Sequence, residues 1–194
     1  MSGGRGAEGL DPVAEAFFAG VLHHLPALTA FTTPSPNSFH RLQPQTWSGA
    51  YLGWGVDNRE VPLRLTGATG DGANVELKAF DATANPHYAL AAVVLAGMEG
   101  MRHTRRLPPP LGFDPGTLTE EGRAERGILR LPASLGEALH ALAADQPLRA
   151  SLASGVGFGS ASLLDAFVEV RRSEEAHFSG WPLEKMAAAL QARY

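Results

Sequence analysis

The 194-residue chain contains no cysteine. A sequence without thiols forms no disulfide, offers no thiolate to a metal ion and has no cysteine nucleophile, so three kinds of site are excluded. The chain is long enough to bury a core without covalent staples. We therefore expect a globular protein that works in the cytoplasm.

An excess of positive charge is also missing. Sixteen Lys and Arg residues stand against twenty Asp and Glu residues, which gives a net charge of -4 and an isoelectric point near 6.0. Nucleic acids and anionic membrane surfaces are bound through basic surfaces. The sequence predicts neither as a partner, and a small molecule is the better expectation for the ligand.

The sequence has no long uncharged run. The longest apolar stretch, Tyr88 to Met98, contains a glycine and ends at Glu99, short of the roughly 20 apolar residues that a membrane-spanning helix needs. The opening MSGGRGAEG lacks the apolar segment of a secretory signal. We interpret residues 1–9 as a flexible arm or a remnant of cloning, and expect the folded domain over residues 10–194.

Several catalytic motifs are missing as well. No GxGxxG follows a strand pattern, and neither GxxxxGK[ST] nor GxSxG occurs, so dinucleotide-binding, P-loop and α/β-hydrolase folds lose their main support. The seven histidines match no metal-ligand spacing such as HExxH, and we expect no zinc site. The glycine-rich GVGFGSAS at 155–162 is best interpreted as a link and a cap for the following helix.

Short strands are predicted at about 50–56, 61–65 and 74–80. Because they are short and separated by turn-rich linkers, we expect a small antiparallel sheet. Pro62 cannot donate to a strand ladder, which places the second strand at an edge or makes Pro62 its start. Strands followed by a mainly helical C-terminal half predict an α+β fold.

Helix-start signals are clear. Asp11 followed by Pro12 places a capping residue and a proline ahead of an apolar periodic run, which predicts a first helix. After Pro86 a run that is apolar nearly all round predicts a buried helix. Ser134 and Glu137 form a capping-box pattern for another helix. Two amphipathic helices are expected at about 160–178 and 182–193.

The stretch NVELKAFDATANP carries charges inside an apolar strand. With a side-chain period of two, Glu76 and Lys78 share one face while Val75 and Leu77 share the other. Spacing alone leaves two interpretations open. Either the charged face is solvated, as in many half-buried strands, or Glu76 lines a cleft as a metal ligand or acid beside a cation that binds phosphate or carboxylate.

Arginines in the preceding loops allow a similar choice. Arg41 lies in NSFHRL, and Arg59 and Arg64 lie five residues apart in NREVPLR. Guanidinium groups bind phosphate and carboxylate oxygens bidentately. Most loop arginines face solvent, however, and their spacing alone does not decide between the two roles.

Taken together, TPSPNSFHRLQPQTWSGAYLGWGVDNREVPLRL and NVELKAFDATANPHYALAAVVLAGMEGM resemble the C-terminal part of the catalytic domain of glutamine synthetase. The likeness is carried by the order and spacing of N-S-aromatic-x-R-L, N-R-x-x-x-x-R, E-x-[RK] and A-N-P. The segments QPQTWSGAY, NREVPLR and LPASLGEALHAL are most similar to the nodulin/FluG-like branch, a type I-like group of γ-glutamyl ligases. The resemblance runs from about Gly9 to the end of the chain.

In that family ATP phosphorylates the γ-carboxylate of glutamate at a site with two or three Mg²⁺ or Mn²⁺ ions, and an amine then attacks the acyl phosphate. By motif position, the resemblance implies that Arg41 binds glutamate and that Arg59 and Arg64 are catalytic. Arg59 would contact ATP phosphates, and Arg64 would also contact the reacting glutamate carboxyl. It implies further that Glu76 is a metal ligand and that Lys78 binds phosphate.

The chain departs from the ammonia-using enzymes at two positions. Lys78 stands where they commonly have arginine, which keeps the charge but loses the bidentate fork. Trp47 stands where they carry a flap glutamate that attracts and deprotonates ammonium, which an indole cannot do. The resemblance therefore implies that the substrates are glutamate and either ammonia or a larger amine. Because of Trp47, we favour a larger amine that packs against this indole.

The family's other metal-binding glutamates and its catalytic histidine come from strands upstream of the first helix. We therefore expect this chain to be the C-terminal portion of a ligase that is a homo-oligomer when complete, with an incomplete ATP and metal site and little activity alone. The alternative is a non-catalytic, synthetase-like module for assembly or regulation, which docks on a full-length synthetase through exposed sheet edges.

Overall fold

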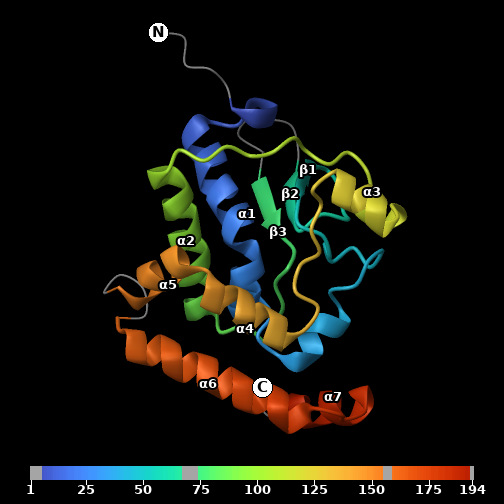
Figure 1. The fold of residues 1–194 in the computed structure, drawn as a ribbon, viewed down its shortest axis with the longest axis vertical. Coiled ribbons are helices and arrows are strands. Elements are labelled where there is room, and N and C mark those ends of the chain that lie inside the picture. Colours follow the sequence, from blue (N-terminus) through green and yellow to red (C-terminus); the bar gives the residue numbers. More distant parts are fainter. Residues whose placement is uncertain (1–5, 67–73, 155–158, 193–194) are drawn as a thin grey trace.

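The computed structural model describes residues 6–66, 74–154 and 159–192 (Figure 1). Its helices are α1 (Pro12–Thr32), α2 (Pro86–Arg102), α3 (Glu120–Glu125), α4 (Leu135–Ala144), α5 (Gln146–Ala153), α6 (Ala161–Phe178) and α7 (Leu183–Gln191). Its strands are β1 (Trp54–Val56), β2 (Leu63–Thr66) and β3 (Asn74–Leu77), and short 3-10 turns are η1 (Ala7–Gly9), η2 (Pro36–His40) and η3 (Pro115–Thr117). The predicted α+β fold is confirmed.

The two central helices begin where the sequence predicts. The Asp11 carboxylate accepts hydrogen bonds from the backbone N–H groups of Val13 and Ala14 at the start of α1. The Asn85 side chain accepts from His87 and Tyr88 in the same way at the start of α2. In both helices proline occupies the first turn, where its missing N–H costs nothing.

Helices α1 and α2 cross at a pair of facing glycines. A Cβ atom added to Gly100 of α2 would lie 2.2 Å from the carbonyl oxygen of Ala16, and one added to Gly20 of α1 would lie 2.3 Å from that of Ala96. Only glycine permits so close an approach of two backbones. By length and composition alone α1 is apolar enough to cross a membrane, but 67% of its apolar stretch is buried within the fold, as in the core helix of a globular domain.

The sheet is small and mixed, with strand order β1-β2-β3. The antiparallel prediction is right for β2 and β3, where Arg64 pairs with Glu76, and wrong for β1 and β2, which run parallel. Parallel neighbours usually need a long crossover. Here each paired strand section spans only about 10 Å at roughly 3.3 Å per residue. The short connector from Asp57 to Pro62 is therefore long enough to bring the chain from the end of β1 back beside its start, where β2 begins.

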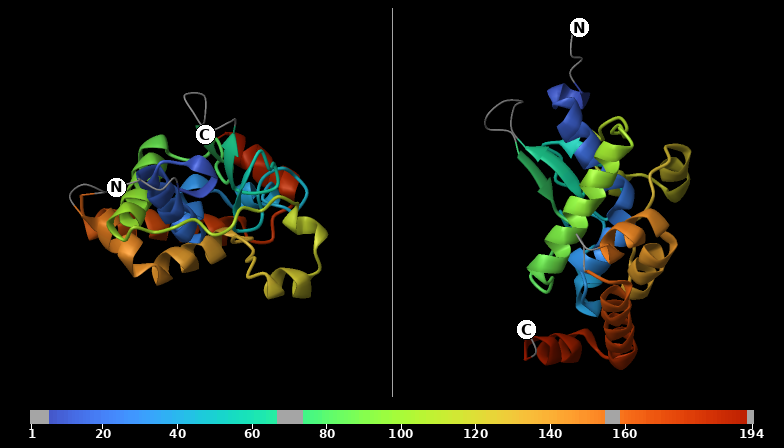
Figure 2. Two further views of the ribbon diagram at one scale, coloured as in Figure 1. Left: turned by 90° about the horizontal axis from the view of Figure 1, so that it is seen from above. Right: turned by 90° about the vertical axis from the view of Figure 1, so that its left-hand side faces the viewer.

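The elements form layers around the α1–α2 pair. Figure 2 shows the sheet on one side of this pair and α4 with α5 on the other. The inward side chains Leu63, Leu65, Val75 and Leu77 join the main core, so the other face of the sheet points outward. Helices α6 and α7 lie at the end of the molecule opposite η1 (Figure 1). The segment after α2 covers β1, since the N–H of Leu111 donates to the carbonyl of Trp54.

Some predictions need correction in detail. The predicted strand at 50–56 is a strand only from Trp54, with Tyr51 in a single bridge to Arg130. Helices α3 and α5 were not predicted, because their proline-bearing neighbourhoods are typical of loops. Helix α2 is buried on one side only, and its side chains Leu90, Val94 and Met101 are exposed. The predicted link at 155–158 lies outside the described residues.

A buried histidine ties α1 to the junction of α4 and α5. His24 is fully buried, and its Nδ1 lies 2.6 Å from Oδ2 of Asp145. The other oxygen of Asp145 accepts a hydrogen bond from the N–H of Leu148 and so caps α5. One carboxylate therefore fixes both the position of α5 and its first turn.

The Asp145 carboxylate predicts an acid limb of stability. Burial acts to raise the pKa of Asp145, but its hydrogen bond and charge interaction with His24 outweigh burial, so the pKa lies below the ordinary 3.8. A carboxylate with a depressed pKa stabilises the fold above its unfolded value, and this contribution is lost as the pH falls through the folded one. Asp145→Asn keeps a capping oxygen without this titration. In urea unfolding between about pH 5 and pH 3, the free energy of unfolding should therefore fall less steeply for Asp145→Asn than for the wild type. Equal slopes would contradict the assignment.

Candidate functional site

The outward face of the sheet carries an ion pair between neighbouring strands. Arg64 of β2 and Glu76 of β3 stand opposite each other in the antiparallel register, and Nη1 of Arg64 lies 3.5 Å from Oε2 of Glu76. Both side chains point away from the core because the inward positions are taken by Leu63, Leu65 and Val75. The period-two prediction for this face is confirmed.

A second carboxylate holds the same arginine. Asp57 follows β1 with φ of 50°, a left-handed conformation that Asp tolerates better than most residues. Its Oδ1 lies 3.3 Å from Nη2 of Arg64. The Nε of Arg64 is buried and has no hydrogen-bond partner among the described residues. Arg64 is thus held from two sides and keeps one buried donor for a further acceptor.

Lys78 extends the charged face by one step beyond Glu76. Its Nζ donates to the backbone carbonyl of Arg59. Burial lowers the pKa of the Lys78 ammonium from its ordinary 10.5; the charges of Arg64 and Arg59 act in the same direction, and those of Glu76 and Glu60 oppose them. The ammonium is therefore a half-buried cation among other cations, an environment that an anionic ligand stabilises.

The two loop arginines meet this face from different directions. Nη2 of Arg41 donates to the carbonyl of Phe80 at 2.8 Å and to that of Lys78 at 3.3 Å. Arg41 thereby holds the chain where it leaves β3. The Arg59 guanidinium lies over the ring of Trp47, 5.5 Å from its centroid, so the two side chains form a cation–π pair.

Trp47 projects into solvent. Its side chain is 64% exposed and its φ is 58°, an uncommon combination for a large aromatic residue. Hydrogen bonds of Thr46 to the carbonyls of Arg41 and Gln43 fix the adjacent turn. An exposed indole on a fixed turn is a surface for stacking rather than a core residue.

All six predicted site residues fall into one neighbourhood. Direct contacts join Arg64 to Glu76, Arg59 to Trp47, and the Lys78 side chain to the Arg59 backbone, while Arg41 binds the Lys78 carbonyl. The sequence missed Asp57. Its signal was available, since Asp-Asn directly after a strand is typical of a turn that can aim a carboxylate back at the sheet.

The residues present do not form a complete metal site. No group of three His, Cys, Asp or Glu side chains lies together in the described part of the chain. Glu76 faces outward, but its contact is with Arg64. Mg²⁺ and Mn²⁺ prefer several oxygen ligands, so this face on its own supplies at most one carboxylate from β3 to such an ion.

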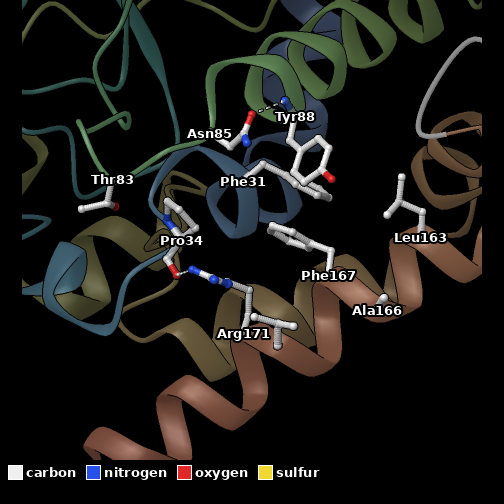
Figure 3. A pocket seen from close by; sticks show the side chains of 10 residues that line it. Phe31, Pro34, Thr83, Asn85, Tyr88, Leu163, Ala166, Phe167 and Arg171 are labelled. Carbon is white, nitrogen blue, oxygen red and sulfur yellow. Dashed lines mark hydrogen bonds between the residues drawn. The ribbon is translucent and has the colours of Figure 1, made fainter. Parts of the chain in front are cut away.

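A separate apolar cavity of about 330 Å³ lies between the end of α1, the start of α2 and α6 (Figure 3). The rings of Phe31 and Phe167 stack at 4.8 Å, and Tyr88 meets Phe167 edge-on. Arg171 at its rim is turned toward the carbonyl of Pro34. None of the six predicted site residues lines this cavity, so its shape adds nothing to the charged face.

Comparison with known proteins gives a consistent family. Residues 1–185 match the family model described as glutamine synthetase, catalytic domain. The chain is 41% identical to gamma-glutamylpolyamine synthetase GlnA3 of Streptomyces coelicolor, over 100% of this chain and 41% of that protein. It is 40% identical to glutamine synthetase of Pyrococcus furiosus, over 76% of this chain and 34% of that protein.

Solved structures agree. The crystal structure of a novel glutamine synthase homolog matches 97% of this chain and 40% of its own length, with a TM-score of 0.75 and 34% identity. A GmaS/ADP complex matches 92% of this chain and 39% of its own length, with a TM-score of 0.71 and 29% identity. The chain thus spans about two fifths or less of the length of these similar proteins.

Proposed function

Because this chain belongs to the glutamine synthetase catalytic-domain family, we propose that it forms one wall of the active site of an ATP-dependent ligase. The reaction joins the γ-carboxylate of glutamate, by way of an acyl phosphate, to an amine. The proposal rests on one observation above all: Arg64 and Lys78, at the outward side of the sheet, lie beside the loop residues Arg41 and Arg59, and Arg64 has an unused buried donor.

The charge balance of this face favours anionic substrates. Arg41, Arg59, Arg64 and Lys78 stand against the carboxylates of Glu60, Asp57 and Glu76, and the last two already pair with Arg64. Glutamate and ATP bring several negative charges, and charge develops further as the phosphoryl group moves. Fixed guanidinium groups stabilise such charge without reorganisation.

Each residue has a role that its position allows. Arg41 is held at the end of β3 and binds the glutamate carboxylate with the donors that the carbonyls leave unused. Arg59 and Arg64 contact the phosphates and the reacting carboxyl, and Lys78 adds a point charge for phosphate. Glu76 contributes one metal ligand to a site whose other ligands come from elsewhere in the complete enzyme.

Trp47 sets the class of amine. Its exposed indole already accepts the Arg59 guanidinium, which shows that a cation fits over the ring. A protonated polyamine or another alkyl amine would pack on the same surface. The 41% identity to a gamma-glutamylpolyamine synthetase supports this choice.

A truncation of the indole tests the amine assignment. Trp47→Ala should raise the KM for a diamine or polyamine by about tenfold, the loss of a contact of roughly 1.4 kcal/mol, and leave the KM for glutamate unchanged. Steady-state ADP release with each substrate varied in turn measures both constants. Phe in place of Trp47 should retain most of the affinity. An equal loss for ammonia and for the polyamine would show that Trp47 does not select the amine.

The reaction itself is tested by ADP release in the complete enzyme that carries this chain. We expect release to require glutamate together with an organic amine such as putrescine or spermidine, and to be slow with ammonia. The isolated chain should show little turnover, because the described part of the chain brings together no three side chains that could hold a metal ion. Glutamate-dependent release with ammonia, unaffected by larger amines, would overturn the amine class. No release with any amine, together with co-elution of the chain with a full-length synthetase, would favour the docking module instead.

A further inference from the structure

A second cationic site lies away from the sheet face, around Arg105. It belongs to a cavity of about 400 Å³ lined by α1, the segment before β1 and the segment after α2. The apolar part of the lining includes Leu22 and Leu52, and the polar part is formed by His23, Arg105 and Arg106. A concave site of this size with a few convergent polar groups is typical of a small-molecule pocket.

Arg105 is the unbalanced charge in this cavity. Its Nε is buried without a hydrogen-bond partner, and Arg105 enters none of the ion pairs within residues 6–66, 74–154 and 159–192. A buried donor left unsatisfied destabilises the fold. A group of this kind calls for a specific explanation, such as a bound water or ion.

The nearby carboxylates already have other partners. Glu15 is buried and pairs with Arg106 at 2.5 Å, while one of its oxygens also accepts from the N–H of Leu107. Glu99 pairs with Arg102 and with His103. These pairings leave the Arg105 guanidinium without a carboxylate partner among the described residues.

The charge of Asp145 also acts on His23, but the Asp145 carboxylate is paired with His24. Burial lowers the pKa of His23; the charges of Arg105 and His24 act in the same direction, and those of Asp145 and Glu99 oppose them.

The backbone before Arg105 is held in an unusual conformation. Thr104 has φ of 45°, a genuine outlier for a β-branched residue. The N–H of Arg105 then closes α2 by donating to the carbonyl of Gly100 at 3.0 Å. This arrangement directs residues 105 and 106 to the cavity at some conformational cost, which structures retain when the surroundings fix it.

From these observations we infer that the cavity around Arg105 binds a small oxyanion, the phosphate or carboxylate group of a metabolite. Arg105 supplies the bidentate fork, while Arg106, whose charge is paired with Glu15, lines the rim. The same two arginines also line an adjoining cavity of about 450 Å³ with Val13 and Met101. A ligand with an apolar extension therefore has room beyond its anionic group.

The experiment titrates the full chain with inorganic phosphate at constant ionic strength, with the arginine Nε–H and histidine ring signals observed by NMR. We expect the Arg105 and His23 signals to shift saturably. Arg105→Gln should weaken phosphate binding at least tenfold, and Arg105→Lys, which keeps the charge, should weaken it less. Arg172→Gln, which changes an exposed arginine of α6 that lines neither cavity, should leave binding unchanged.

Succinate and chloride identify the class of anion. Saturation by phosphate alone assigns a phosphate site, and saturation by succinate assigns a carboxylate site. A linear response, equal for phosphate, succinate and chloride, would overturn the proposal. So would equal phosphate affinity in Arg105→Gln and in the wild type, with backbone spectra showing that both are folded. Neither outcome depends on ligase activity.

Discussion

Replacing Arg64 with glutamine should lower kcat/KM of the complete ligase by about 100- to 1,000-fold, the usual cost of removing one fixed donor that stabilises transition-state charge. Arg64 stands on β2 between Asp57 and Glu76, and its Nε remains available to a ligand. Glutamine keeps a polar side chain of similar reach but has no charge and no fork. The loss should therefore fall on kcat more than on substrate affinity.

Stability provides the internal check. The partners of Arg64 are largely exposed, with 60% of the Asp57 side chain and 48% of the Glu76 side chain accessible, and ion pairs of this kind contribute only about 0–1 kcal/mol. The variant should unfold at nearly the same urea concentration as the wild type. Arg126→Gln, an exposed arginine whose partner is the Gly122 carbonyl, should leave both activity and stability unchanged. Full activity in Arg64→Gln would remove the central support for the proposed site.

Gly100→Ala should have the largest effect on folding. The new Cβ would meet the backbone of α1 at 2.2 Å, and backbone cannot rotate away as a long side chain can. Overpacking typically costs about 1–3 kcal/mol, so the gain of roughly 1 kcal/mol in helix propensity is outweighed. The clash is severe, so we take the overpacking cost near its upper value of about 3 kcal/mol. After the gain of about 1 kcal/mol in helix propensity, the free energy of unfolding should fall by about 2 kcal/mol.

A second helical glycine gives the matched control. A Cβ on Gly122 of α3 would find its nearest neighbour, the Thr119 hydroxyl oxygen, at 3.4 Å. Gly122→Ala should therefore stabilise the chain by up to about 1 kcal/mol. Urea unfolding of both variants compares the signs directly. The same sign for the two substitutions would show that the α1–α2 crossing does not depend on its glycines.

Local signals made the helices predictable. Asp11 and Asn85 cap α1 and α2 with side-chain hydrogen bonds that reach two or three residues along the chain, so the sequence contains both partners. Helix α5 was not predicted, for a related reason. Pro147 in its first turn is typical of a break as well as of a start, and the cap of Asp145 on Leu148 decides between them.

The sheet could be predicted only in part. The period of two placed Glu76 on the charged face, but the structure was needed to show that Arg64 stands opposite it in the antiparallel register. The parallel pairing of β1 and β2 could not be predicted, because it depends on a connector held from a distance, where Asn58 donates to the carbonyls of Leu111 and Phe113. Contacts between segments some 50 residues apart leave no pattern in either segment.

The same limit applies to the candidate site. Spacing indicated that Arg59 and Arg64 could bind one phosphate chain, and the family resemblance implied the roles of Arg41 and Lys78. In the structure, one nitrogen of Arg41 donates to the carbonyls of Lys78 and Phe80, and the Lys78 ammonium donates to the backbone carbonyl of Arg59. These hydrogen bonds depend on how three loops fold together. Periodicity does not describe loops, so these contacts became visible only in the structure.

The segment around Leu111 covers the β1 edge of the sheet, which determines the edge at which a further strand could pair. One outer strand is sealed by a backbone hydrogen bond from that segment, while β3 is the outer strand on the other side. Any further strand that joins this sheet must therefore add next to β3. Alternate side chains of such a strand would then stand beside Glu76, where a second carboxylate would have to arrive if Glu76 is to share an ion.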